Sequence, residues 1–134
     1  MLGTRDPNKL AVRPWLRENP AGSVGTFEQA ARFGGLVVLA TLGRAAEEAI
    51  QMAGPANLAG KTVMDTTNPI AESAPVGGIL VFTTGPNESL GERIQSALPL
   101  AHVVKAFNIQ QRGRGADGQP QLPAGHSHHV SLRR

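Results

Sequence analysis

A hydroxyl and a guanidinium stand side by side near the start of the chain, where Thr4 and Arg5 follow a short apolar segment. Arg can meet a phosphate with two parallel hydrogen bonds, and a hydroxyl beside it adds a further donor. At the end of a strand that faces a bound nucleotide, this pair suits a ribose phosphate, whereas an acidic side chain would bind a free ribose hydroxyl. The same residues would also form an ordinary strand-to-helix turn, so both interpretations stand.

A second polar motif, DTTNP at residues 65–69, comes directly after an apolar run. The side chain of Asn68 offers a donor and an acceptor, which suits a carboxamide ligand such as nicotinamide. Asn-Pro is also common turn chemistry, and this motif taken alone favours the turn.

A third motif, VVKAFN at residues 103–108, again combines an apolar run with polar residues at its end. Lys105 could pair with a phosphate or with a carboxylate of a substrate. Phe107 is predicted to be a core residue, with a ring platform for a ligand as the alternative.

These motifs lie among alternating apolar runs and helix-forming segments. Continuous apolar runs predict strands over 36–41, 61–65 and 102–107. The first of these strands is expected to be covered on both faces. Good helix formers predict helices over 43–53 and 89–98. This alternation predicts a parallel sheet with right-handed crossovers, with each motif at a strand end.

Helix starts can also be predicted from capping residues. Ser89 and Glu92 are spaced as a capping box, and Thr26 is expected to cap a short helix that reaches Arg32. Asp6 precedes Pro7, a favoured first helical residue, which predicts a helix from there that Pro14 kinks.

Composition changes abruptly after Asn108, where Gly, Pro, Gln, Arg and His dominate. We therefore predict a folded domain over 1–108 and a disordered tail over 109–134. Three of the four histidines lie in the tail, at positions 126, 128 and 129, without a framework to fix coordination geometry, so no metal site is expected.

The pI of about 10.2 comes from the tail rather than from the domain. Residues 1–108 carry nine basic and nine acidic side chains, and the tail lacks aromatic residues for stacking, so no nucleic-acid partner is predicted. No apolar run approaches the roughly 18 residues that cross a bilayer, so no membrane partner is expected. The absence of cysteine and of a secretion signal fits a cytoplasmic protein.

Taken in order, GTRDP, VVLAT, DTTNP and VVKAFN resemble the coenzyme F-420-dependent NADP oxidoreductase family over residues 1–108. The resemblance implies an NADP-binding Rossmann domain that transfers a hydride between NADP and a deazaflavin coenzyme or a related acceptor. Both reactive carbons belong to cofactors, so no catalytic side chain is expected, and this region has no Cys, no Tyr and no histidine except His102.

The resemblance also implies the cofactor-binding residues. Thr4 and Arg5 would hold the 2′-phosphate of NADP. Ala40 and Thr41 would line the pyrophosphate and ribose path. The residues around the nicotinamide would be Asn68, Pro69 and Ala106.

The chain departs from the family at both ends. The family's first strand and its G-x-G-x-x-G turn are absent, and Met1 falls inside what would be the second strand. We therefore expect an incomplete doubly wound parallel sheet, truncated at the N-terminus and followed by an unrelated tail, with impaired activity. A non-catalytic nucleotide-binding or interaction module, or the product of a decaying gene, is the alternative, and self-association stays open.

Overall fold

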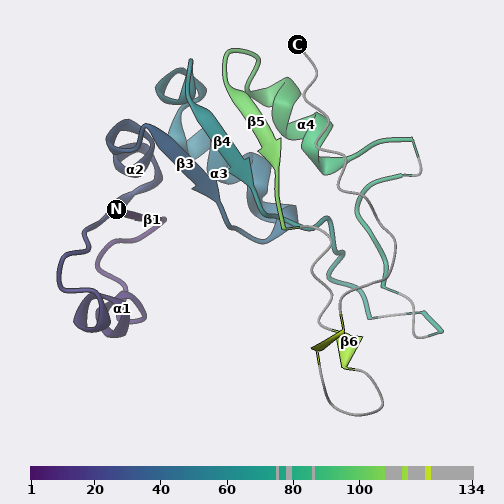
Figure 1. Cartoon of the computed structure of the whole chain (residues 1–134), viewed down its shortest axis with the longest axis horizontal. Helices are drawn as coiled ribbons and strands as arrows, with labels where there is room; N and C mark the ends of the chain where they lie inside the picture. Colours follow the sequence, from purple (N-terminus) through teal and green to yellow (C-terminus); the bar gives the residue numbers. More distant parts are fainter. Residues whose placement is uncertain (75, 78–79, 86, 108–112, 115–119, 122–134) are drawn as a thin grey trace.

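The structure is a computed structural model that describes residues 1–74, 76–77, 80–85, 87–107, 113–114 and 120–121. Strands β1 (Leu2–Thr4) and β2 (Val24–Thr26) pair in parallel, with Leu2 opposite Val24. A second parallel sheet has the order β3-β4-β5, built from Leu36–Leu39, Thr62–Asp65 and His102–Lys105 (Figure 1). The parallel pairing confirms the predicted α/β fold class.

Short helices connect these strands. They are α1 (Val12–Glu18), α2 (Phe27–Phe33), the 3₁₀ helix η1 (Gly43–Ala45), α3 (Ala46–Ala53), the 3₁₀ helix η2 (Pro55–Leu58) and α4 (Leu90–Ala97). The segment predicted as one helix over 43–53 therefore begins with a 3₁₀ turn before it becomes α-helical.

Capping boxes fix the starts of α2 and α4, as predicted. The hydroxyl of Thr26 accepts from the backbone N–H of Gln29 at 3.1 Å, and the Gln29 side chain accepts from the Thr26 N–H at 2.8 Å. Ser89 and Glu92 make the same reciprocal pair at 3.1 and 2.9 Å. Each box satisfies two backbone groups at a helix end.

The helix predicted to begin at Pro7 begins instead at Val12, and Asp6 does not cap it. The Asp6 carboxylate accepts from the backbone N–H of Asn8 at 2.9 Å, which closes a local turn. Pro14 explains the later start, since its ring would clash with the carbonyl four residues earlier in any longer helix. In the first turn, where no N–H partner is needed, Pro14 is tolerated.

Helix α2 ties the two sheets together because it packs against β1 and β2 as well as against α3. The core lies between α2, α3, α4 and one face of β3–β5. Its most completely buried large side chains are Ile50, Ile94, Leu98 and Val63.

Strand β3 is covered on one face, which corrects the prediction that both faces are buried. Leu39 is buried, but Leu36 and Val38 are 56% and 54% exposed. In Figure 1, α3 lies behind β3 and β4, while no described helix stands in front of them. A continuous apolar run predicts burial only where elements exist to cover both faces.

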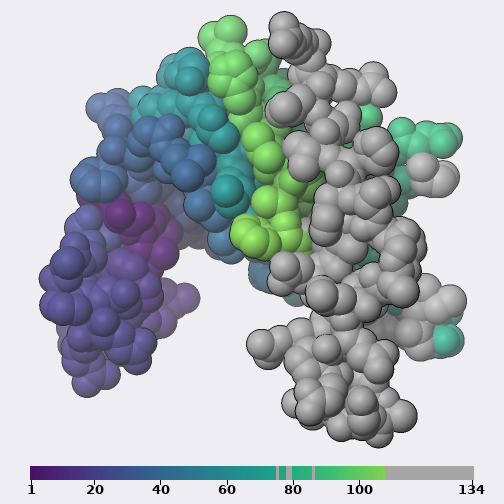
Figure 2. Space-filling view, viewed as in Figure 1, coloured from purple at the N-terminus to yellow at the C-terminus, as the bar shows by residue number. Residues whose placement is uncertain are grey.

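A groove of about 450 Å³ separates β1 from β3, and its lining is almost entirely apolar. Figure 2 shows the purple N-terminal residues between the lobe that holds α1 and the edge of β3. From β1 the chain moves outward to β2, then crosses back to β3 and continues through β4 to β5. The strand order of a doubly wound sheet reverses at this groove, and within the described residues no strand fills it.

Few residues of the predicted tail are described by the structure. Gly113–Arg114 (β6) pairs antiparallel with Pro120–Gln121 (β7), and the rest of the predicted tail lies outside the described residues. In the part of the chain that the structure describes, no helix has the length and apolar character to cross a bilayer.

Hydrogen exchange should distinguish the two edges of β3. The carbonyl of Leu39 accepts from the Thr66 N–H on the β4 side at 3.0 Å, so alternate residues, including Val38, direct their backbone groups toward the groove. We expect the Val38 amide to exchange at least about tenfold faster than that of Val37, as measured by NMR. Equal protection of both amides would show that the groove edge is covered in solution.

Candidate functional site

The predicted binding residues all follow the carboxyl ends of strands, one of them in the β1-β2 sheet and three in the β3-β4-β5 sheet. Thr4 ends β1 and Arg5 follows it. Ala40 and Thr41 come directly after β3. Beyond β4, Asn68 and Pro69 form part of the loop that leaves the sheet, and beyond β5 the first residue is Ala106.

Two hollows bring some of these residues together. Thr41 and Asn68 line one of about 280 Å³ at the ends of β3 and β4, with Arg44 beside them. Ala40 and Thr41 also line the groove between β1 and β3. The linings of both hollows leave out Thr4, Arg5, Pro69 and Ala106.

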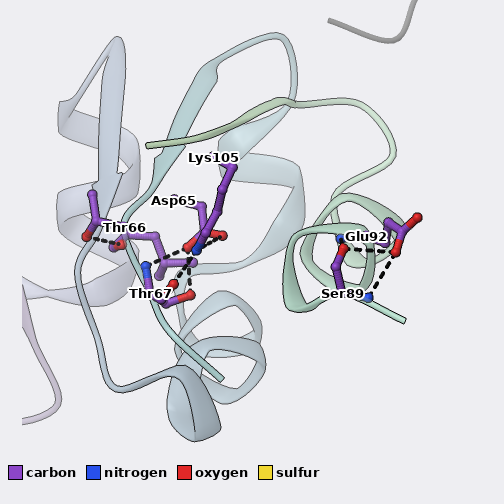
Figure 3. Close-up of polar contacts among 7 residues, drawn as sticks. Asp65, Thr66, Thr67, Ser89, Glu92 and Lys105 are labelled. Atoms are coloured by element: carbon purple, nitrogen blue, oxygen red, sulfur yellow. Dashed lines mark hydrogen bonds and ion pairs between the residues drawn. The ribbon is translucent and has the colours of Figure 1, made fainter. Parts of the chain in front are cut away.

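A buried carboxylate organises the end of β4 (Figure 3). Asp65 is fully buried, and one of its oxygens accepts from the Thr67 N–H at 2.8 Å and from the Thr67 hydroxyl at 2.6 Å. Its other oxygen pairs with the Lys105 ammonium at 3.0 Å, and Lys105 also donates to the Thr67 carbonyl. Burying a charge is costly unless it is paired and hydrogen-bonded, and these contacts meet both conditions.

The neighbouring threonine ties the same loop to β3. Both the N–H and the hydroxyl of Thr66 donate to the carbonyl of Leu39, at 3.0 and 3.1 Å. DTTNP therefore contains three residues that position the loop, ahead of the Asn-Pro pair that the sequence singled out. The sequence feature that could have indicated this positioning role is a carboxylate at the end of an apolar strand, followed by two hydroxyl side chains.

The structure gives the third motif a positioning role. Lys105 is engaged by Asp65 and Thr67, rather than standing ready for a phosphate or a substrate carboxylate. Phe107, predicted as a core residue, is 67% exposed. Its φ of 59° turns the chain away just beyond β5, so its side chain does not continue the sheet pattern.

A close backbone approach joins the β3 and β4 loops. An added Cβ at Gly43 would overlap the carbonyl oxygen of Asn68. Only glycine therefore lets the start of η1 contact this loop, and nothing in the sequence pattern indicated this. The same contact forms one wall of the smaller hollow.

Among the described residues, one buried side-chain oxygen has no hydrogen-bond partner, the hydroxyl of Thr41. Thr41 lines both hollows, so a ligand at this edge could supply the partner. Buried polar groups without partners are rare, and a ligand is one recognised explanation for them.

Arg5 is already engaged in an ion pair. Its guanidinium lies 2.6 Å from the carboxylate of Glu48 in the first turn of α3, and the two side chains are 54% and 60% exposed. The pair links the end of β1 to the helix that follows β3. Glu48 was not predicted as a site residue, since the two positions are 43 apart in the sequence.

Comparison with known proteins finds similar solved structures. No model of a known protein family matches the chain, and neither does any curated protein sequence. A solved structure from Arthrobacter sp. FB24, named as a candidate F-420-dependent NADP reductase, is similar, with a TM-score of 0.73 and 35% identity. The similarity covers 87% of this chain and 57% of that one, so the chain spans little more than half of the neighbour's length. The match supports the Rossmann-type fold and the family resemblance.

Removing the Lys105 ammonium should destabilise the fold. Lys105→Met would leave the buried Asp65 charge without a cation, which we expect to lower the free energy of unfolding by about 3 kcal/mol in urea titrations. The double variant Asp65→Asn/Lys105→Met should recover part of this loss, because it removes the unpaired charge. A loss below about 1 kcal/mol for Lys105→Met would mean that water reaches Asp65.

A single methyl group at Gly43 should also be poorly tolerated. Gly43→Ala forces the Asn68 carbonyl to move, and we expect a loss of about 2–3 kcal/mol in unfolding free energy. Gly35→Ala is the matched control, since no atom lies within 4 Å of its added Cβ. Equal stability of the two variants would show that the Asn68 loop shifts freely.

Proposed function

We propose that this chain is the NADP-binding part of an oxidoreductase that transfers a hydride between NADP and a deazaflavin coenzyme of the F-420 type. The observation that carries the proposal is the similarity to the Arthrobacter protein, whose name contains both cofactors. The four sequence motifs point to the same family independently of the fold.

The layout of the sheet supports a nucleotide at this edge. Ligands of doubly wound sheets bind outside the carboxyl ends of the strands, where the strand order reverses. Here that place is the end of the groove between β1 and β3, which Thr41 lines; Arg5 follows β1 and does not itself line the groove. The unpaired Thr41 hydroxyl fits a ribose or a pyrophosphate oxygen as its partner.

Each predicted residue has a proposed role along an extended dinucleotide. Arg5 and Thr4 would bind the 2′-phosphate, and Ala40 with Thr41 would line the pyrophosphate and ribose path. Around the nicotinamide we place Asn68, Pro69 and Ala106. When bound, the nicotinamide and the deazaflavin supply the two carbons that exchange the hydride. The residues of this chain would bind and orient them, which is the larger part of such catalysis.

One observation favours the alternative of a non-catalytic binding module. Backbone N–H groups of a glycine-rich turn at a helix N-terminus normally hold the pyrophosphate. Within the described residues no such turn stands between a strand and a helix. We therefore propose weak dinucleotide binding by residues 1–108, with 109–134 as a tail outside the binding domain.

NMR titration of the chain with NADP and NAD tests the proposal. We expect NADP to bind more weakly than micromolar, and more tightly than NAD. Arg5→Ala should weaken NADP binding by about 1.5–3 kcal/mol, the range for a hydrogen bond to a charged group, and leave NAD nearly unchanged. Arg32→Ala is a matched control, since Arg32 is also exposed and paired with a glutamate, on α2.

Equal losses for both dinucleotides in Arg5→Ala would show that Arg5 does not bind the 2′-phosphate. The redox part is tested separately, by following oxidation of NADPH in the presence of the oxidised deazaflavin. Dinucleotide binding without any hydride transfer would favour the non-catalytic module.

A further inference from the structure

The ion pair between Arg5 and Glu48 lies where the proposed 2′-phosphate would bind. Arg5 follows the carboxyl end of β1, and Glu48 lies in the first turn of α3, which follows β3 through η1. Their contact of 2.6 Å therefore joins elements from the two sides of the groove between β1 and β3. A ligand that uses Arg5 must share this guanidinium with Glu48 or replace it.

We infer that Glu48 sets the affinity of this site for a 2′-phosphate, because it occupies Arg5 until a 2′-phosphorylated ribose displaces it. This inference rests on the proposed NADP binding. The displaced group is a carboxylate of charge −1 that accepts one hydrogen bond from Arg5, whereas a phosphate carries about −1.5 to −2 and can accept two parallel hydrogen bonds from Arg.

The strength of the ion pair suits such an exchange. Both side chains are more than half exposed, and exposed pairs contribute at most about 1 kcal/mol. A 2′-hydroxyl carries no charge, so it cannot displace the Glu48 carboxylate from Arg5. Glu48 would therefore lower the affinity for every anion at Arg5, and only a strongly charged ligand would overcome it.

A structural role for Glu48 is the competing explanation, because acidic residues in the first turn stabilise a helix. Glu28 provides the control for this effect. It lies in the first turn of α2, pairs with Arg32 at the same 2.6 Å, and the side chains of Glu28 and Arg32 are likewise both more than half exposed. Glu28→Gln therefore removes an equivalent charge and an equivalent ion pair away from Arg5.

The test is titration calorimetry or NMR titration with adenosine 2′,5′-bisphosphate and adenosine 5′-monophosphate. We expect Glu48→Gln to bind the bisphosphate about fivefold more tightly than the wild type, the upper range for release of an exposed ion pair. Glu28→Gln should stay within about twofold of the wild type, and the monophosphate should bind all three proteins alike. In the double variant Arg5→Ala/Glu48→Gln the gain should vanish.

Three results would overturn the inference. Weaker or unchanged bisphosphate binding in Glu48→Gln would show that Glu48 orients Arg5 for the phosphate or does not act on it. A gain that persists without Arg5 would show that the carboxylate acts by general repulsion. If the wild type and Glu48→Gln bind the bisphosphate no better than the monophosphate, the proposed NADP preference itself fails. That result differs from the first two, in which the bisphosphate is still preferred.

Discussion

Asp65 is fully buried, and each of its carboxylate oxygens is used by a different part of the chain. One holds the N–H and hydroxyl of Thr67, and the other holds Lys105 from the neighbouring strand. This arrangement joins the ends of β4 and β5 and sets the path of the loop beyond β4. The Asn68 carbonyl then lies against Gly43, so the position of η1 and α3 also depends on it. A single buried charge thus helps to position β4, β5, η1 and α3 around the candidate site.

The other half of the site depends on α2. This helix of seven residues is the main packing link between the β1–β2 pair and the larger sheet, since it contacts β1, β2 and α3. The position of Arg5 relative to Thr41 is set by this packing, because backbone pairing does not cross the groove within the described residues. The two sides of the candidate nucleotide site are therefore held by different kinds of interaction.

Much of the fold could be predicted because its signals are local. Apolar runs located β3, β4 and β5, and the Ser89–Glu92 spacing located the start of α4. The helix after Asp6 was placed too early, since a favourable first residue at Pro7 counted for more than the steric effect of Pro14. The exposure of Val38 and Phe107 could not be predicted, because burial depends on which elements cover a face.

The placement of the motifs at strand ends was predictable, but their contacts were not. Strand ends share an edge in any parallel sheet, so the motifs were expected to gather there. The pairing of Arg5 with Glu48 and the approach of Gly43 to Asn68 join residues far apart in the sequence. Residue spacing in the sequence does not predict such contacts. These contacts determine which side chains already have a partner within the protein.

The open edges of β1 and β3 have a consequence for how the protein behaves in solution. Unpaired strand edges act as templates for pairing with other chains, and natural proteins usually blunt them with charges, proline or a covering element. Here the exposed edge of β3 carries Leu36 and Val38, and the groove lining beside it includes the half-exposed Met1 and Phe33. Among the residues that the structure describes, no charged side chain lines this groove. Whether the chain stays dispersed at high concentration therefore depends on what covers the exposed edge of β3.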